Sequence, residues 1–235
     1  MNREVTFETK CYEKDWRLLL LTPRLQTMIQ YNRFPFKETM LYINNVNDPD
    51  EVGFYAGKLV QNGLLTSYVI VDTYAREALD FFGIDKNSFN GGYYYSIAEL
   101  VSIYLAKTKY ILHYSSDSIL AGELDWIEAA LEKMESDARI KVANPTWNFS
   151  YAYARQEAEE EDSRFYVGYG FSDQCYLIRT ADFRARIYNE KNPESERYPA
   201  YGGELFEKRV DAWMRNHHHL RITYKHGSYI HRNFG

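Results

Sequence analysis

Features of secreted and membrane proteins are scarce in this sequence. Its 235 residues include only two cysteines, Cys11 and Cys175, which lie far apart and match no zinc spacing, so we expect two buried thiols in a reducing compartment. No apolar run approaches the ~18 residues that a membrane span requires, and the first ten residues lack the apolar core of a signal peptide. We therefore expect a cytoplasmic protein with no membrane span. Peripheral contact with a membrane surface is compatible with this expectation.

Two common nucleotide-binding motifs and any excess of positive charge are also missing. The chain contains neither GxGxxG nor a P-loop, and its net charge of −5 argues against nucleic-acid binding, which requires a basic face. Tyrosine, in contrast, is abundant, with 22 residues. Tyrosine combines an apolar ring with a hydrogen-bonding tip, so the enrichment suits sugar-like or nucleobase ligands, although an AT-rich genome would produce it equally.

The first half of the chain alternates between apolar runs and amphipathic segments. The expected strands cover residues 5–7, 39–43, 67–71 and 110–112, with residues 9–12 as an exit loop. The expected helices cover residues 16–31, dented or split at Pro23, and 51–62, 76–82, 95–107 and 124–134. Strands separated by helices of 10–15 residues imply an α/β fold with a mostly parallel sheet and helices on both faces.

The pattern changes after residue 143. We expect strands at 165–170 and 175–179, a helix at 204–215, and two short strands at 221–224 and 229–231. Residues 155–162 (RQEAEEED) form an acidic run, for which we expect an exposed helix or a mobile loop that can act as a lid. No internal repeat or clean linker appears, so the two parts are expected to share one sheet.

The segment YILHYSSDSIL at residues 110–120 is the strongest functional signal. An apolar strand ends there in hydroxyl side chains around a single carboxylate, Asp117. Open α/β sheets place ligands at the carboxyl ends of their strands, and a buried carboxylate requires a cation or a basic partner. A simple turn residue that caps the following helix is the alternative.

Three later segments add candidate ligand groups. Residues 168–174 (GYGFSDQ) combine glycines, which permit close approach of the backbone, with Asp173, which can bond a sugar hydroxyl or form an ordinary Asx turn. Residues 202–207 (GGELFE) begin a helix with carboxylates, which the helix dipole favours. A histidine near the chain end, His231 in YIHR, or His226 as the alternative, is a possible metal ligand.

In this order, these motifs resemble the GT-A fold glycosyltransferases, particularly the inverting family-2-like group. The resemblance implies one GT-A-like domain over 1–235, with a nucleotide-sugar-binding half at 1–122 and a smaller, mixed acceptor-binding half at 123–235. It places Asp117 at the last carboxylate of a DxD-type motif, with Ser115 in place of the first Asp and Ser116 between them. Asp117 and His231 would then contact Mn²⁺ or Mg²⁺ and the donor diphosphate.

The resemblance also implies roles for the remaining candidates. The catalytic base lies at the helix start after the glycines, where Glu204 is slightly favoured over Glu207. The acceptor side of the donor sugar is assigned to Gly170, Ser172, Asp173 and Gln174. The nucleotide and its diphosphate are assigned to Thr9, Asn45, Asp48, Asp72, Tyr95, Ser115 and Ser116.

The resulting hypothesis is a transferase that moves a sugar from a nucleotide-diphosphate sugar to the hydroxyl of a glycan or lipid-linked acceptor, with inversion. Small relatives of this kind act most often in bacterial surface polysaccharide synthesis, which the resemblance suggests here. A nucleotidyltransferase-like nucleotide-binding enzyme and a non-catalytic carbohydrate-binding module are the alternatives. Nucleic acid is not expected as a partner.

Overall fold

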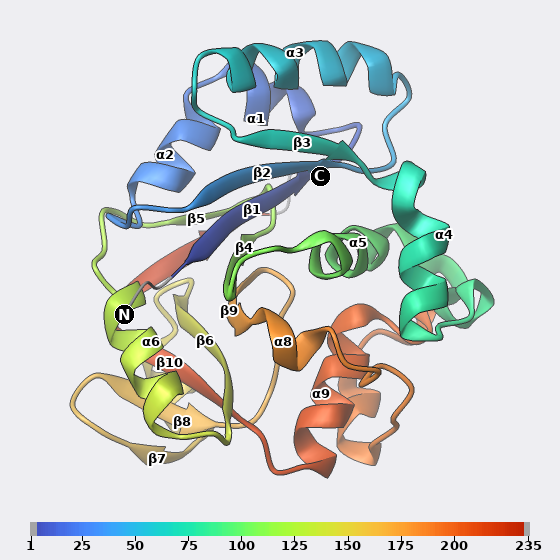
Figure 1. Ribbon diagram of the computed structural model, residues 1–235. Helices are drawn as coiled ribbons and strands as arrows, with labels where there is room; N and C mark the ends of the chain where they lie inside the picture. The colour runs from blue at the N-terminus through green and yellow to red at the C-terminus, as the bar shows by residue number, and fades with distance from the viewer. Residues whose placement is uncertain (1–3, 233–235) are drawn as a thin grey trace.

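Strand β1 (Val5–Cys11) lies within a ten-stranded sheet and pairs with a parallel strand on each side. In the computed structural model, which describes residues 4–232, the strand order is β3-β2-β1-β4-β9-β6-β10-β8-β7, with β5 paired to β10 (Figure 1). The remaining strands are β2 (Glu38–Ile43), β3 (Ser67–Ile70), β4 (Tyr110–Tyr114), β5 (Ser118–Leu120), β6 (Ile140–Trp147), β7 (Ala158–Glu161), β8 (Phe165–Gly168), β9 (Cys175–Arg179) and β10 (Leu220–His231).

The sheet is mostly parallel, as the alternation of strands and helices predicted. Strands β3, β2, β1 and β4 run parallel to one another, and β6 and β10 form a further parallel pair. Strand β9 lies antiparallel between β4 and β6, while β8 and β7 add an antiparallel edge. The expected α/β fold with a smaller mixed part is therefore confirmed.

Helices cover both faces of the sheet, and each face has its own hydrophobic core. Figure 1 shows α1, α2 and α3 on one side of β1–β3, and α4, α5, α8 and α9 on the other. The bounds are α1 (Trp16–Leu21), α2 (Arg24–Gln30), α3 (Pro49–Gln61), α4 (Val71–Phe82), α5 (Ile97–Leu105), α6 (Ile127–Ser136), α7 (Tyr151–Gln156), α8 (Thr180–Phe183) and α9 (Phe206–Asn216), with short 3₁₀ segments at Lys86–Tyr95, Pro193–Arg197 and Ala200–Gly202.

The order of the strands creates a crevice beside β1. Strands β2 and β3 follow β1 outward on one side, whereas the next strand, β4, pairs with the other side of β1. The connections therefore diverge at the carboxyl ends of β1 and β4, which is where open α/β sheets bind ligands. Asp117 lies three residues beyond the end of β4.

Several expected element boundaries differ from the structure. Strand β1 extends through Cys11, so residues 9–12 are not an exit loop. Helix α4 begins at Val71, directly after β3, rather than at residue 76. Pro23 splits the first helical segment into α1 and α2, because proline lacks the N–H that a continuous helix needs.

The second half differs more. The acidic run at residues 155–162 is neither one exposed helix nor a loop, because α7 ends at Gln156 and β7 pairs with β8. The two short strands expected near the C-terminus are one strand, β10, with an irregular register between Tyr224 and Ser228. Both cysteines are buried free thiols, as expected. Within residues 4–232, no helix has the length and apolar character of a membrane span.

Candidate functional site

The turn after β4 is held by its own hydroxyl groups. Ser115 Oγ donates to Asp117 Oδ1 at 2.7 Å, and Ser116 Oγ donates to the Asp15 carboxylate. Both serines are almost fully buried, and Arg24 Nε donates to the Ser116 carbonyl at 2.8 Å. The serines therefore fix the direction of the turn, and Asp117 is the side chain that it presents.

Asp117 forms an ion pair with His231, which lies at the end of the neighbouring strand β10. His231 Nε2 lies 3.1 Å from Asp117 Oδ2, and the two side chains are 19% and 22% exposed. They meet because β5, just after Asp117, pairs antiparallel with the end of β10 and aligns His231 with Ser118. Burial opposes ionisation of Asp117, but hydrogen bonds from His231 and Ser115 outweigh it and lower its pKa. The hydrogen bond to Asp117 in turn raises the pKa of His231.

The Asp117–His231 pair has the spacing of one edge of a divalent-cation site, which a cation would occupy on displacing the proton that Nε2 donates to Asp117. Neighbouring donors around an octahedral cation with bonds near 2.1 Å are about 3 Å apart, which matches the Nε2–Oδ2 separation of 3.1 Å. Between residues 4 and 232, no group of three or more His, Cys, Asp or Glu side chains could hold a metal ion. The other positions would therefore fall to phosphate and water oxygens, which Mg²⁺ commonly retains.

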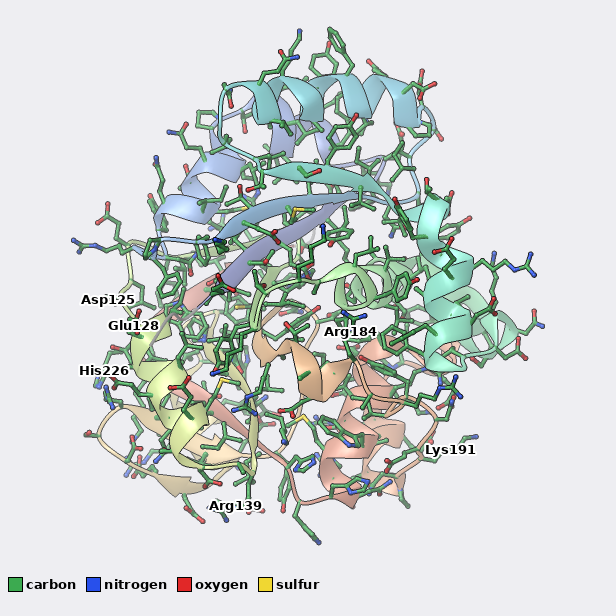
Figure 2. The ribbon with its side chains drawn as sticks, in the orientation of Figure 1. Asp125, Glu128, Arg139, Arg184, Lys191 and His226 are labelled. Carbon is green, nitrogen blue, oxygen red and sulfur yellow. The ribbon has the colours of Figure 1, made fainter. Side chains whose placement is uncertain are left out.

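His226, the alternative histidine, lies elsewhere. Its Nε2 is 2.9 Å from the Ser163 carbonyl oxygen, and its side chain sits at the periphery of the molecule (Figure 2). It therefore has a surface contact with the loop before β8, whereas His231 reaches the turn after β4.

A cavity of about 410 Å³ opens beside the pair, and His231 lines it. Three other predicted residues, Ser172, Gln174 and Glu207, share this cavity. The rest of its wall is polar and aromatic: Asn144, Trp147, Asn148, Tyr153, Glu157, Phe171, Arg197, Tyr198, Pro199, Arg221 and Tyr229.

Glu207 occupies the first turn of α9. Its carboxylate accepts a hydrogen bond from the backbone N–H of Asp173, but burial and the negative charge of Asp173 raise its pKa to about 8. The glycines before α9 bring it here. Gly203 has a φ of +61°, and a Cβ at this position would lie 2.5 Å from the Ser88 carbonyl oxygen. Only glycine allows this approach without displacement.

Glu204 faces a different environment. Its Oε1 lies 3.2 Å from Lys208 Nζ, and its carbonyl oxygen accepts from Arg209 Nε at 2.7 Å. It precedes α9 and is absent from the residues that line the cavity.

The glycine-rich segment connects the cavity to the Asp117 turn. Gly170 has a φ of +108°, which strongly favours glycine. Ser172 Oγ accepts from Gln174 N at 3.3 Å. The Gln174 carbonyl accepts from Ser115 N at 2.9 Å. Asp173 lies between them, and its charge contributes to the raised pKa of Glu207.

A buried network of ionisable side chains, which the sequence pattern did not indicate, links β1 to α5 and β4. Lys10 forms an ion pair with Glu99 of α5 and donates to the Tyr95 carbonyl at 3.4 Å. Behind them, His113 Nδ1 lies 3.1 Å from Glu8 Oε1. Burial raises the pKa of Glu8 to about 8 and lowers that of His113 to about 4, so both are mainly uncharged near neutral pH.

The signal for this network was present in the strand. The polar residues 6, 8 and 10 alternate with the apolar residues 5, 7 and 11, but residue 9 is also polar. This polar stretch indicated a loop from residue 9 onward. In the structure, Glu8 and Glu99 are 2% and 1% exposed. The charge of Lys10 also acts on Glu207 and stabilises its ionised form, so the network is coupled electrostatically to the cavity.

The residues predicted for the nucleotide lie along the carboxyl edge of the parallel strands, with mixed local roles. Thr9 is fully buried within β1. Asn45, which is exposed, follows β2 and has a φ of +50°. Asp48 caps α3 by accepting from the N–H groups of residues 50 and 51 at 3.0 and 2.9 Å. Asp72 is exposed in the first turn of α4, and Tyr95 is 57% exposed. Their contacts with a nucleotide stay predictions.

No family model and no curated protein matches the chain. Solved structures do resemble it. TarS of S. aureus has a TM-score of 0.55 and 13% identity, covering 98% of this chain. Glucosyl-3-phosphoglycerate synthase from Mycobacterium tuberculosis, in complex with Mn²⁺, UDP and phosphoglyceric acid, has a TM-score of 0.53 and 11% identity, covering all of this chain and 72% of its own. A mycobacterial protein has a TM-score of 0.54 and 10% identity, covering all of this chain and 69% of its own.

This chain spans only 37% of the length of TarS, so the likeness concerns part of that protein. Identities of 10–13% establish the fold alone. The activity is therefore argued from the geometry of the site. The sheet order, the crevice beside β1 and these neighbours together give the chain the GT-A fold of glycosyltransferases.

Proposed function

We propose that this protein is a nucleotide-sugar-dependent glycosyltransferase. The observation that carries the proposal is the convergence of groups on the cavity beside the Asp117–His231 pair. His231, which is paired with Asp117, and Glu207 line one cavity. A group that can bind a cation and a group that can accept a proton are thus presented to the same space. An inverting transfer of a sugar from a diphosphate can use both, the cation to stabilise the leaving group and the base to accept the proton of the acceptor hydroxyl.

Asp117 and His231 would hold the divalent cation. A bound cation neutralises the charge that develops on the diphosphate leaving group. The Mycobacterium tuberculosis synthase was solved with Mn²⁺ and UDP, which supports a cation and a uridine nucleotide as the first ligands to test. Ser115 and Ser116 fix the turn that presents Asp117, so their proposed role is to position the carboxylate.

Glu207 is the proposed catalytic base, in preference to Glu204. A base must reach the acceptor hydroxyl within hydrogen-bonding distance, and its pKa should lie near the working pH. Glu207 lines the cavity and has a pKa of about 8, whereas Glu204 is paired with Lys208 outside it. Proton removal by Glu207 while the hydroxyl attacks the anomeric carbon from the face opposite the diphosphate would invert the configuration.

The remaining assignments follow the two sides of the crevice. Asn45, Asp48, Asp72 and Tyr95 are proposed for the nucleotide, along the edge where the parallel strands end, whereas Thr9, fully buried within β1, is proposed to support this edge from inside the strand. Gly170, Ser172, Asp173 and Gln174 are proposed for the donor sugar, because this segment joins the Asp117 turn to the cavity. A glycan or lipid-linked acceptor in surface polysaccharide synthesis is the proposed setting.

Thermal unfolding with UDP, GDP or dTDP, with and without Mn²⁺, tests the proposal. A ligand at one hundred times its Kd adds about 2.7 kcal/mol to stability, which raises Tm by roughly 5–10 °C for a chain of this length. We expect one nucleotide to produce a shift of this size only with the cation. A flat response to all three would contradict the proposal and favour a carbohydrate-binding module.

Product analysis separates the two enzyme classes. A glycosyltransferase releases a nucleoside diphosphate from the nucleotide sugar, whereas a nucleotidyltransferase releases pyrophosphate from a nucleoside triphosphate and a sugar phosphate. Pyrophosphate release without diphosphate release would overturn the assignment.

A further inference from the structure

Two arginines line the cavity without a role in the chemistry proposed above. Arg221 comes from β10 and is 9% exposed. Its Nη2 lies 3.3 Å from Glu157 Oε2, but its buried Nε has no hydrogen-bond partner. Arg197, from the 3₁₀ segment at residues 193–197, has its Nη2 3.2 Å from Asp211 Oδ1. A buried donor without an acceptor is unfavourable, so the Arg221 guanidinium group keeps hydrogen-bonding capacity that the protein itself does not use.

The two guanidinium groups converge on one point. A Cβ at Gly170 would lie 3.1 Å from Arg197 Nη2 and 3.3 Å from Arg221 Nη1. The absence of a side chain at Gly170 therefore leaves room for both groups on the same side of the backbone.

The local charges do not balance. Asp211 is shared, because its Oδ2 also lies 2.8 Å from Arg215 Nε. Three guanidinium groups therefore face two carboxylates, those of Glu157 and Asp211. Planar guanidinium groups bind carboxylates and phosphates through paired N–H donors. Because Glu207 in the same cavity is mainly protonated near neutral pH, three guanidinium groups that share two carboxylates, together with the unused donor of Arg221, favour an anion.

Aromatic side chains surround this anion-binding position. Trp147, Tyr153 and Tyr198 line the same cavity. Arg221 lies over the Trp147 ring at 5.4 Å from its centroid, and the Trp147 and Tyr153 rings are 6.0 Å apart. Such rings offer a large apolar surface with polar edges, which suits the face of a sugar ring.

We infer that the acceptor is an acidic sugar, whose carboxylate or phosphate is bound by Arg197 and Arg221. The aromatic side chains would contact the ring, and Glu207, in the same cavity, would face one of its hydroxyls. The identification of the bound sugar as an acceptor rests on the proposed glycosyltransferase activity, whereas the anion site itself does not depend on it.

Binding of three small sugars to the full chain tests the inference. Glucuronate, glucose 6-phosphate and glucose are titrated separately, with binding followed by ligand-observed NMR, in the presence and absence of UDP and Mn²⁺. We expect at least one of the two acids to bind at least tenfold more tightly than glucose, and the preferred acid identifies the anionic group. We expect this binding to persist when UDP and Mn²⁺ are present.

Three variants locate the binding. Arg197→Gln should reduce the preference for the acid at least fivefold, and Arg221→Lys should reduce it through loss of the paired donors. Arg155→Gln is the matched control, because Arg155 is exposed, pairs with Glu161 and does not line the cavity. If Arg221→Lys unfolds, Arg197→Gln still tests the site, because Asp211 keeps its contacts with Arg215 and Ser195.

The outcomes separate the inference from the proposed function. Equal binding of glucose and both acids, or an equal effect of Arg155→Gln, overturns the inference. Displacement of the acid by UDP and Mn²⁺ also overturns it, because the arginines would then hold the donor diphosphate. If an acid binds through Arg197 but no nucleotide binds, the anion site stands and the transferase proposal fails. If a nucleotide binds but neither acid does, the inference alone fails.

Discussion

Replacement of Glu207 by Gln removes the proposed base while preserving the shape of the side chain. The Gln carbonyl oxygen can still accept the hydrogen bond from the Asp173 N–H that the Glu207 carboxylate accepts. Loss of a general base reduces turnover by about 10²–10⁴-fold. We expect Glu207→Gln to lose turnover in this range while its Tm stays equal to or above that of the wild type, because the substitution removes a carboxyl that is costly to ionise in place.

The pH dependence gives a second, independent measure. With a pKa of about 8, roughly one Glu207 in ten is ionised at pH 7, half at pH 8 and nine in ten at pH 9. Because the base acts in its ionised form, wild-type kcat/KM should rise about tenfold between pH 7 and pH 9. Release of the nucleoside diphosphate from the donor sugar measures both the rate and its pH profile.

Glu204→Gln is the matched control, since it makes the same chemical change three residues earlier. Glu204 is paired with Lys208 outside the cavity, so its variant should keep turnover within about threefold of the wild type and retain the rise with pH. Loss of turnover in Glu204→Gln, with both the rate and the pH profile retained in Glu207→Gln, would show that Glu207 is not the base.

Two further changes test the metal pair and the buried network. Asp117→Asn should abolish the Mn²⁺-dependent part of the Tm shift that the nucleotide produces. Without ligand its Tm should fall by only a few degrees, because the pair with His231 is partly exposed and such pairs contribute roughly 1 kcal/mol or less. If the variant is unfolded without ligand, Asp117 is structural. Glu8 has a folded pKa of about 8 against 4.5 when unfolded, so the stability linked to its protonated form is present below pH 4.5 and is lost as the pH rises towards 8. Glu8→Gln should therefore gain about 3 kcal/mol relative to the wild type between pH 5 and pH 8 in urea unfolding, and parallel stability curves would contradict the pKa.

The sequence predicted the parallel part of the fold because its strands are continuous apolar runs. Strands β2 and β4 carry little polar sequence, and a proline marked the break between α1 and α2. These signals are local, since each depends on a few adjacent residues. They were sufficient to give the alternation of elements and therefore the mostly parallel sheet.

Strand β1 was cut short for the opposite reason. Glu8 and Lys10 are charged residues in a buried strand, and charge in a short segment normally indicates a loop. Their partners, His113 and Glu99, come from elements about a hundred residues away. Only the fold brings these partners together, so no local pattern could have shown that Lys10 is paired with Glu99 and that Glu8 is mainly uncharged. The edge strand β7 is similar in one respect, because its Glu161 pairs with Lys225, which lies 64 residues later in the chain.

The choice between Glu204 and Glu207 shows what limits a prediction of the site. Both residues follow the glycines at a helix start, and the dipole of α9 would favour a carboxylate at either position. What separates them is where the helix begins and how it is rotated. Just before the helix, Gly203 lies against the Ser88 carbonyl and the Glu204 N–H donates to it at 2.9 Å, and Ser88 is more than a hundred residues earlier in the chain. A motif can therefore name the turn of helix that carries a base, but the direction in which each carboxylate points depends on a contact that the motif does not contain.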